Sequence, residues 1–204
     1  MNQKTINLAI THLSNDSKLK TIIDNHSKPN FKKNNDYYNS LAKSIIYQQL
    51  SGRVANIIYN RFLNTFQNRK LDPKIIINMS EKELKNIGLS KQKTSYIKDL
   101  SLYFLKKKNS IDFKLMNDDE IRNELILIKG IGHWTIDMFL MFTMLRPNIL
   151  PTGDLGIKKG LKKLFNLKDL PDDEYMLKKS KPWEPYRTIA CCYLWRLVDD
   201  EDFW

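Results

Sequence analysis

The chain has 204 residues, of which 42% are hydrophobic and 28% charged, and its 34 lysine and arginine residues outnumber 23 acidic residues to give a net charge of +11. This length is enough for one globular unit or two small lobes, which should bury roughly 70% of the unfolded surface. The positive charge suits a polyanionic partner, and the two cysteines are too few for a disulfide framework or a cysteine-rich metal cluster.

The start of the chain carries no sign of export. Its first ten residues lack a long apolar core followed by a cleavage site, so we expect no secretory signal and an intracellular protein. Cys191 and Cys192 are adjacent in an apolar helical pattern, where core thiols in a reducing compartment are expected. The most apolar segment, residues 134–145, is too short to span a membrane.

Residues 39–66 carry two helical patterns, separated near Ser51-Gly52. Hydrophobic residues recur at helical spacing in both, which predicts a buried face on each helix. In the first pattern they are Leu41, Ala42, Ile45 and Ile46. In the second they are Val54, Ile57, Ile58, Phe62 and Phe66.

Further helix signals follow along the chain. Asp72-Pro73 opens a short helix, Ser80 with Glu83 matches a capping box, and Ser90 begins a longer helix. The inward-facing residues of that longer helix are Ile97, Leu100 and Phe104. The remaining predicted helices cover residues 117–129, 134–145, 154–165, 172–179 and 186–198. The sequence shows no convincing alternating strand pattern, which predicts an all-α fold.

A glycine-rich turn, Lys129-Gly130-Ile131-Gly132, joins the predicted helices 117–129 and 134–145. Because glycine tolerates a positive φ, such a turn can reverse the chain tightly and bring its backbone close to another surface. The unpaired N–H groups and the positive dipole end of the following helix can bind a phosphate. The glycines alone equally fit a turn that packs two core helices.

Two carboxylates near this turn are candidates for chemistry. Asp154 begins a helical pattern within the segment PTGDLG, residues 151–156. Aspartate is favoured at the N-cap of a helix, so capping alone would explain it. Asp137 lies in the apolar helix, where a structural hydrogen-bonding role is expected.

Four segments carry a family likeness: residues 44–51 (SIIYQQLS), residues 87–93 (IGLSKQK), residues 125–156 with the turn and Asp154, and residues 183–188 (WEPYRT) with Trp195. In this order they resemble the helix-hairpin-helix (HhH-GPD) DNA glycosylases, and within them the branch typified by 3-methyladenine DNA glycosylases. The likeness spans about residues 40–198. One Gly-Ile-Gly turn would be a weak signal, whereas the four segments together are specific.

The resemblance implies a two-lobed, all-α glycosylase fold with an active-site cleft between the lobes. Residues 1–204 would form one glycosylase unit. One lobe would comprise about residues 50–145, including the helix-hairpin-helix at 117–145, and the other about residues 1–49 and 146–204. The chain is too short at its front for the extra β domain of some relatives.

Asp154 is the residue to which the resemblance assigns the chemistry. It matches the family's Pro-x-x-Asp-Leu-Gly segment at the usual distance behind the hairpin. Breaking an N-glycosidic bond develops positive charge on the sugar, and a fixed carboxylate can stabilise that charge or orient water. Asp137 is the second choice for this role.

Trp134 stands where bifunctional relatives that also cut the DNA backbone carry a lysine nucleophile, so the resemblance implies a monofunctional hydrolase. An aromatic ring there can stack on a cationic base, with core packing as the alternative. Tyr186 matches a second pocket aromatic, and Trp183 matches a supporting residue of the base pocket. Met138 stands where some relatives have a pocket tyrosine, which leaves the selectivity open.

Gln49 matches the position from which relatives fill the gap left by a flipped nucleotide, and Leu50 could wedge beside it. Alternatively, Gln48 and Gln49 form hydrogen bonds within the protein. Ser51 belongs to the same segment and fits an ordinary helix cap equally well.

For DNA binding, the resemblance implies that Gly130, Gly132 and Thr135 offer donors to a phosphate, with His133 beside them. His133 is not expected to bind a metal, because the sequence has no second histidine or cysteine at ligand spacing. Relatives can hold a sodium or potassium ion on backbone carbonyls at this hairpin, here those of Ile126, Ile128 and Ile131. An iron–sulfur cluster needs four cysteines and is excluded, so no cofactor is expected.

The resemblance therefore implies a monofunctional DNA glycosylase that flips alkylated purines of the 3-methyladenine or 7-methylguanine type out of double-stranded DNA and excises them in base excision repair. One alternative is a glycosylase of the same fold for another lesion, such as a deaminated base. The other is a helix-hairpin-helix protein that binds DNA without chemistry. A monomer with no membrane partner is expected.

Overall fold

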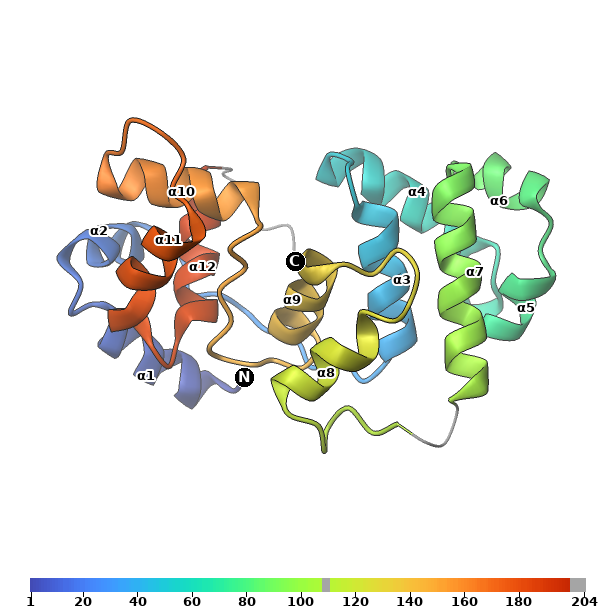
Figure 1. Cartoon of the computed structure of the whole chain (residues 1–204), viewed down its shortest axis with the longest axis horizontal. Helices are drawn as coiled ribbons and strands as arrows, with labels where there is room; N and C mark the ends of the chain where they lie inside the picture. Colours follow the sequence, from blue (N-terminus) through green and yellow to red (C-terminus); the bar gives the residue numbers. More distant parts are fainter. Residues whose placement is uncertain (108–110, 199–204) are drawn as a thin grey trace. The chain divides into compact units, whose positions relative to one another are not determined.

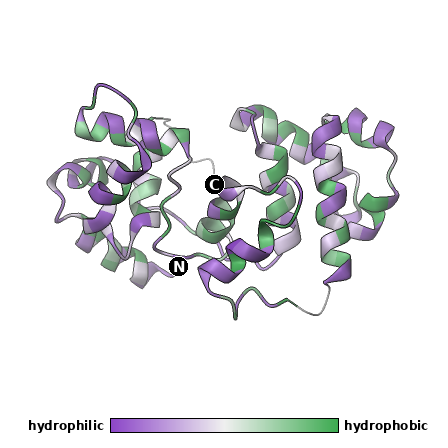
Figure 2. Cartoon of the chain, viewed as in Figure 1, coloured by the Kyte–Doolittle hydropathy of each residue, from purple (hydrophilic) through white to green (hydrophobic). Residues whose placement is uncertain are grey.

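The computed structural model describes residues 1–107 and 111–198. This described part contains 12 α-helices, two short 3-10 helices and no β-strand, which confirms the all-α prediction (Figure 1). Most helices carry hydrophobic and hydrophilic residues on different faces, as expected of helices that each bury one side (Figure 2). No helix among the described residues combines the length and the apolar character needed to cross a membrane.

The chain divides into two compact units, Met1–Lys33 with Leu140–Trp204 (unit 1) and Asn34–Phe139 (unit 2). The lobes expected from the sequence placed residues 34–49 with the N-terminal helices, whereas the structure places them in unit 2. The reason is packing, because the helix at Tyr37–Tyr47 lies against two helices from the middle of the chain.

Unit 1 is built around its C-terminal helix. Its helices are α1 (Gln3–Leu13), α2 (Ser17–Asn25), α10 (Leu155–Phe165), α11 (Asp173–Ser180) and α12 (Arg187–Arg196), with a 3-10 turn at Lys181–Trp183. Helix α12 packs against α1, α2 and α10. The contact with α10 is close, since a Cβ added at Gly160 would lie 2.7 Å from the carbonyl oxygen of Leu194.

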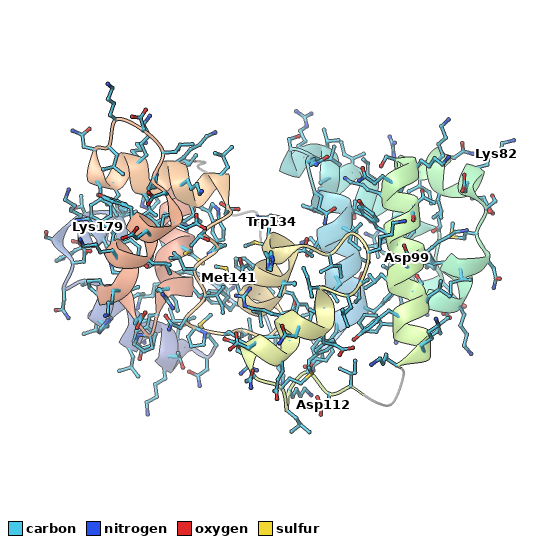
Figure 3. All side chains as sticks on the ribbon, in the orientation of Figure 1. Lys82, Asp99, Asp112, Trp134, Met141 and Lys179 are labelled. Atoms are coloured by element: carbon cyan, nitrogen blue, oxygen red, sulfur yellow. The ribbon has the colours of Figure 1, made fainter. Side chains whose placement is uncertain are left out.

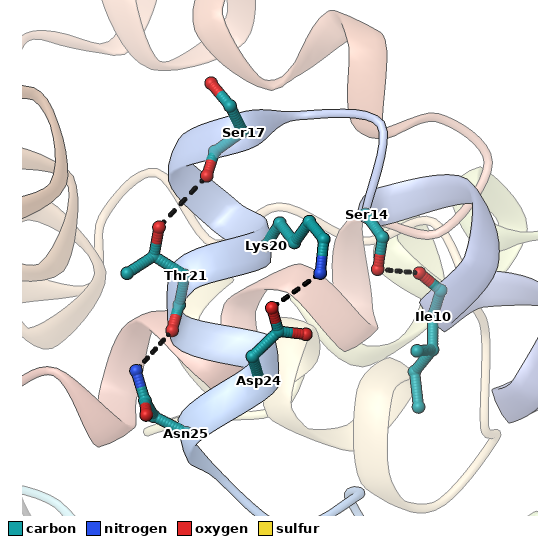
Figure 4. Close-up of polar contacts among 7 residues, drawn as sticks. All are labelled: Ile10, Ser14, Ser17, Lys20, Thr21, Asp24 and Asn25. Atoms are coloured by element: carbon teal, nitrogen blue, oxygen red, sulfur yellow. Dashed lines mark hydrogen bonds and ion pairs between the residues drawn. The ribbon is translucent and has the colours of Figure 1, made fainter.

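Local polar contacts define the two N-terminal helices (Figure 4). Asp16 caps α2 by accepting from the amides of Lys18 and Leu19. Along α2, Lys20 pairs with Asp24 one turn later at 2.5 Å. Exposed pairs of this kind add little to stability, so the hydrophobic faces of α1 and α2 supply most of it.

Unit 2 is built around α7. Its helices are α3 (Tyr37–Tyr47), α4 (Gly52–Asn64), α5 (Pro73–Asn78), α6 (Glu81–Ile87), α7 (Lys91–Lys106), α8 (Asp118–Leu125) and most of α9 (His133–Phe142). Helix α7 packs against α3, α5 and α6. Its Tyr103 hydroxyl donates to Glu124 on α8 at 2.8 Å, and burial together with this carboxylate raises the pKa of Tyr103.

Most of the predicted helix signals are confirmed. The predicted N-caps Asp72, Ser80 and Ser90 accept backbone amides, and Ser80 with Glu83 forms the capping box. The predicted helix 117–129 ends earlier, at Leu125, because residues 126–130 form turns and a bend.

The predicted inner face of α4 is partly wrong. Leu41, Ala42, Ile45 and Ile46 of α3 are all fully buried, as predicted. In α4, however, Val54 and Ile57 are 44% and 46% exposed. Ala55 and Phe62 are two turns apart and fully buried, so they define the inner face and leave Val54 and Ile57 on the opposite side.

Candidate functional site

Asp154 is the N-cap of α10 in unit 1, and its carboxylate is held by two N–H donors. Oδ1 accepts the backbone amide of Ile157 at 2.8 Å and the indole Nε1 of Trp195 at 2.9 Å. The residue is 9% exposed. The capping role considered for Asp154 is therefore real, and the bond from α12 fixes the carboxylate beyond what capping requires.

The third residue of the Asp-Leu-Gly segment makes this arrangement possible. A Cβ at Gly156 would lie 2.8 Å from Cδ1 of Trp195 and 3.0 Å from Oδ1 of Asp154, closer than such atoms normally approach. Phe142 packs against the Trp195 ring with centroids 5.9 Å apart. Sequence reasoning included Trp195 in the family likeness without giving it a role, and its spacing from Asp154 offered no signal for this bond.

The glycine-rich turn of residues 129–132, called the hairpin below, connects α8 to α9 in unit 2. Gly130 has a φ of +87°, and a Cβ there would lie 2.1 Å from the Tyr96 ring, so only glycine fits. At Gly132 an added Cβ would meet no atom within 4 Å. Gly132 and His133 are exposed at the start of α9, as a phosphate-binding turn requires.

Trp134 and Thr135 follow in the first turn of α9. Trp134, labelled in Figure 3, is half-buried. Thr135 is only 1% exposed, and its Oγ1 accepts the side-chain amide of Gln48 at 3.0 Å. The Thr135 hydroxyl oxygen is thus bonded inside unit 2, and a phosphate contact through the Thr135 backbone stays a prediction.

The loop after α3, residues 48–51, is called the insertion loop below. Gln48 points back into unit 2, while Gln49 is exposed and has a φ of +57°. Leu50 is 37% exposed beside it. Gln48 is therefore the internal hydrogen-bonding residue, whereas the gap-filling role of Gln49 stays a prediction. Ser51 is exposed at the N-cap of α4, where no side-chain capping bond is formed within the described residues.

The predicted base-pocket residues differ in exposure. Tyr186 is half-buried, and its ring meets the edge of His12 with centroids 5.5 Å apart. Trp183 is fully buried and donates its indole N–H to Asp16 at 2.8 Å. Met138 is 1% exposed within α9. Trp183 and Met138 are therefore core residues in this structure, and neither offers surface to a base.

Asp137, the second-choice carboxylate, has a structural role. It is 7% exposed and pairs with Arg122 on α8 at 2.6 Å, which ties together the two helices that flank the hairpin. This pair matches the hydrogen-bonding role expected from the sequence.

The described residues contain no group of three or more histidine, cysteine, aspartate or glutamate side chains arranged to hold a metal ion. Cys191 is fully buried as predicted, and Cys192 is half-buried. Ile126, Ile128 and Ile131 lie in the turns after α8, and the carbonyl of Ile128 accepts the amide of Ile131 at 3.0 Å. A carbonyl oxygen has a second lone pair, so a monovalent cation on these carbonyls stays a prediction.

Comparisons with known proteins agree with one another. A family model described as the HhH-GPD superfamily of base excision DNA repair proteins matches residues 42–185. The chain is 34% identical over 197 residues to YfjP of Bacillus subtilis, covering 93% of this chain and 68% of that protein. It is 29% identical to DNA-3-methyladenine glycosylase 1 of Schizosaccharomyces pombe, covering 94% of this chain and 87% of the relative.

Solved structures show the same relationship. The structure of Schizosaccharomyces pombe 3-methyladenine DNA glycosylase Mag1 in complex with abasic DNA matches with a TM-score of 0.83 and covers 95% of this chain and 98% of its own. A DNA-3-methyladenine glycosidase from Bacillus halodurans matches with a TM-score of 0.75 at 32% identity, covering 91% of this chain and 86% of its own. The chain therefore belongs to the HhH-GPD superfamily of base excision DNA repair proteins and groups with its 3-methyladenine glycosylases.

Proposed function

We propose that the protein is a monofunctional DNA glycosylase that hydrolyses the N-glycosidic bond of alkylated purines in duplex DNA and leaves an abasic site. The observation that carries this proposal is the Asp154 carboxylate, fixed by N–H donors from Ile157 and Trp195. The names of the relatives support the lesion class, since several are DNA-3-methyladenine glycosylases.

The proposed chemistry needs one carboxylate. As the bond between base and sugar breaks, positive charge develops on the deoxyribose, and a carboxylate in a fixed position stabilises that charge or orients the attacking water. A purine methylated at N3 or N7 already carries a positive charge and leaves readily, so no paired general acid is required. Hydrolysis by this route needs no cofactor.

Base recognition is assigned to aromatic rings with exposed surface. Trp134 and Tyr186 are both half-buried, and an aromatic face over a cationic base contributes about 0.5–2 kcal/mol. Extruding the base costs a few kcal/mol, which such stacking helps to offset. Because Trp134 replaces the lysine of bifunctional relatives, the amine that would form a Schiff base and cut the backbone is missing at this position.

DNA binding is assigned to the hairpin and the insertion loop. Gly130, Gly132 and His133 would bind a phosphate through the positive end of α9. Gln49 and Leu50, both exposed, would enter the gap left by the flipped nucleotide. All of these residues come from one chain, and the protein is proposed to act as a monomer on double-stranded DNA.

The test is base release from methylated duplex DNA. We expect the wild-type protein to liberate methylated purines and Asp154→Asn to bind the same duplex while losing base release. Near-normal excision by Asp154→Asn would refute the assigned role. Release of hypoxanthine from a hypoxanthine-containing duplex, with no release of methylated purines, would favour a same-fold glycosylase for deaminated bases. Binding with no base released from either duplex would favour a non-catalytic protein. A borohydride-trapped adduct would contradict the monofunctional assignment.

A further inference from the structure

The insertion loop is anchored from α7 by Lys93. Its ammonium donates to the carbonyl oxygens of Ile46 and Gln48, each at 2.7 Å. These carbonyls belong to the end of α3, which has its last helical residue at Tyr47. A lysine at the C-terminal end of a helix satisfies carbonyls that the helix leaves unpaired and complements the negative dipole end.

The charge of Lys93 is thus used inside the protein. Lys93 is half-buried, and burial lowers the pKa of its ammonium group. On a strongly basic protein of the proposed function, an amine near the insertion loop would ordinarily be assigned to a DNA phosphate. The two short bonds to backbone carbonyls give it a different task, which is to hold the loop.

A second anchor joins the insertion loop to the hairpin. The Gln48 side-chain amide donates to the carbonyl oxygen of Gly130 at 2.9 Å and to Oγ1 of Thr135 at 3.0 Å. One acceptor lies in the hairpin and the other in the first turn of α9. Gln48 therefore connects both sides of the predicted phosphate-binding turn to the loop proposed to enter the DNA.

The same face of α7 supports the hairpin directly. Tyr96 lies one turn after Lys93, so the two side chains lie on one side of the helix. The Tyr96 ring packs where a Cβ of Gly130 would otherwise be, and Gln92 donates to the Tyr96 hydroxyl at 2.6 Å. Helix α7 is thus a common platform under both loops.

The anchors surround a residue in an unfavourable backbone conformation. Gln49 has a φ of +57°, which side chains other than glycine seldom adopt and which persists only where the surroundings enforce it. The preceding residue, Gln48, is held by two hydrogen bonds. Its backbone carbonyl accepts from Lys93, and its side-chain amide donates to the hairpin. This holds Gln49 and Leu50 outward.

We propose that Lys93 and Gln48 are positioning residues that lock the insertion loop to the hairpin, so that phosphate binding and nucleotide extrusion are carried out by one rigid element. This inference rests on the proposed function. It predicts that Lys93 does not contact DNA, and that its loss weakens the extruded state without weakening general affinity for duplex DNA.

The experiment compares Lys93→Met with Lys91→Met, a matched control that removes one positive charge from the exposed first position of the same helix. Two affinities are measured, one for undamaged duplex and one for a duplex with a tetrahydrofuran abasic-site analogue, together with single-turnover base release. We expect both variants to bind undamaged duplex equally. Because small misplacements of a positioned group lower rates by up to about 100-fold, we expect Lys93→Met alone to lose base release by roughly 10- to 100-fold.

Lys93→Arg and Gln48→Leu complete the design. Arginine can donate to the same two carbonyls and should restore most of the lost rate, whereas Gln48→Leu should act like Lys93→Met. In the double variant, Lys93→Met with Gln48→Leu, the fold-loss in base release should be smaller than the product of the two single fold-losses. Thermal denaturation checks that each variant is folded. If Lys93→Met fails to fold, Lys93→Arg and Gln48→Leu still decide the matter through the same measurements.

The outcomes separate this inference from the proposed function. Wild-type base release by a folded Lys93→Met or Gln48→Leu variant would overturn the inference, and so would a selective loss of undamaged-duplex affinity in Lys93→Met. If the wild-type protein releases no base, the proposed function fails. The preference for abasic-site duplex over undamaged duplex still tests the loop anchors in that case, because binding needs no catalysis. Loss of this preference in Lys93→Met, but not in Lys91→Met, would support the anchoring role of Lys93.

Discussion

Replacing Gly156 by alanine tests how the Asp154 carboxylate is held. The added Cβ would lie 2.8 Å from Cδ1 and 2.9 Å from Nε1 of Trp195, and 3.0 Å from Oδ1 of Asp154. Atoms in contact normally lie about 3.5–4.0 Å apart, so the indole and the carboxylate must separate from the new methyl group by roughly 0.5–1 Å. Their own hydrogen bond, now 2.9 Å long, lies in the path of that movement.

Such a displacement stretches the bond to about 3.5 Å or more, where a hydrogen bond is largely lost. Because a misplacement of this size lowers catalytic rates by up to about 100-fold, base release should fall roughly 10- to 100-fold. Overpacking costs about 1–3 kcal/mol, and alanine recovers about 0.5–1 kcal/mol of helix propensity. The net loss in the free energy of unfolding is therefore expected to be about 0–2.5 kcal/mol.

The assay is single-turnover base release from methylated duplex with the protein in excess, combined with denaturant unfolding of the same samples. Gly153→Ala is the matched control, because a Cβ at Gly153 would meet no atom within 4 Å. We expect Gly153→Ala to behave like the wild type. A Gly156→Ala variant that releases bases within about twofold of the wild-type rate, well below the expected loss, would refute the argument that the bond from Trp195 sets the carboxylate.

Three further substitutions separate recognition from folding. Trp134→Ala should reduce excision of methylated purines more than affinity for undamaged DNA, and equal losses in both binding and excision would indicate a folding defect instead. Trp183→Phe removes the indole N–H that donates to Asp16. The free energy of unfolding should therefore fall by about 1–3 kcal/mol, while base release at low temperature is retained. Asp137→Asn breaks the charge pair with Arg122 and should lower the free energy of unfolding by about 1–3 kcal/mol, measured by denaturant titration; an unchanged midpoint would contradict the structural role.

Much of the fold could be predicted because its signals are local. Asp72, Ser80 and Ser90 begin helices in the structure as their sequence contexts predict, since an N-cap is decided by residues within one turn. The inner face of α3 followed from the spacing of its apolar residues. The face of α4 did not, because Val54 and Ile57 share the helical period of the buried residues, and only the packing partner decides which side is covered.

The candidate site shows the same limit. Asp154 and the hairpin could be identified from their motifs, yet the partners that hold them come from distant parts of the chain. Trp195 is 41 residues from Asp154, and Gln48 is 82 residues from Gly130. Burial also decides which predicted site residues keep accessible surface. Met138, for example, is buried in the structure and keeps almost none. No local pattern carries such information, because each contact depends on how the helices pack.

Gly160 is a position at which a common stabilising substitution should fail in this protein. A glycine in the middle of a helix is an obvious target, because alanine there usually gains about 0.5–1 kcal/mol. Here the side chain would press on the carbonyl of Leu194 at 2.7 Å and push α10 away from α12. Asp154 caps the first of these helices and Trp195 lies on the second, so a change in their spacing would also disturb the hydrogen bond that holds the candidate carboxylate. Alanine at this position is therefore expected to destabilise the packing of α10 on α12 instead of stabilising the protein.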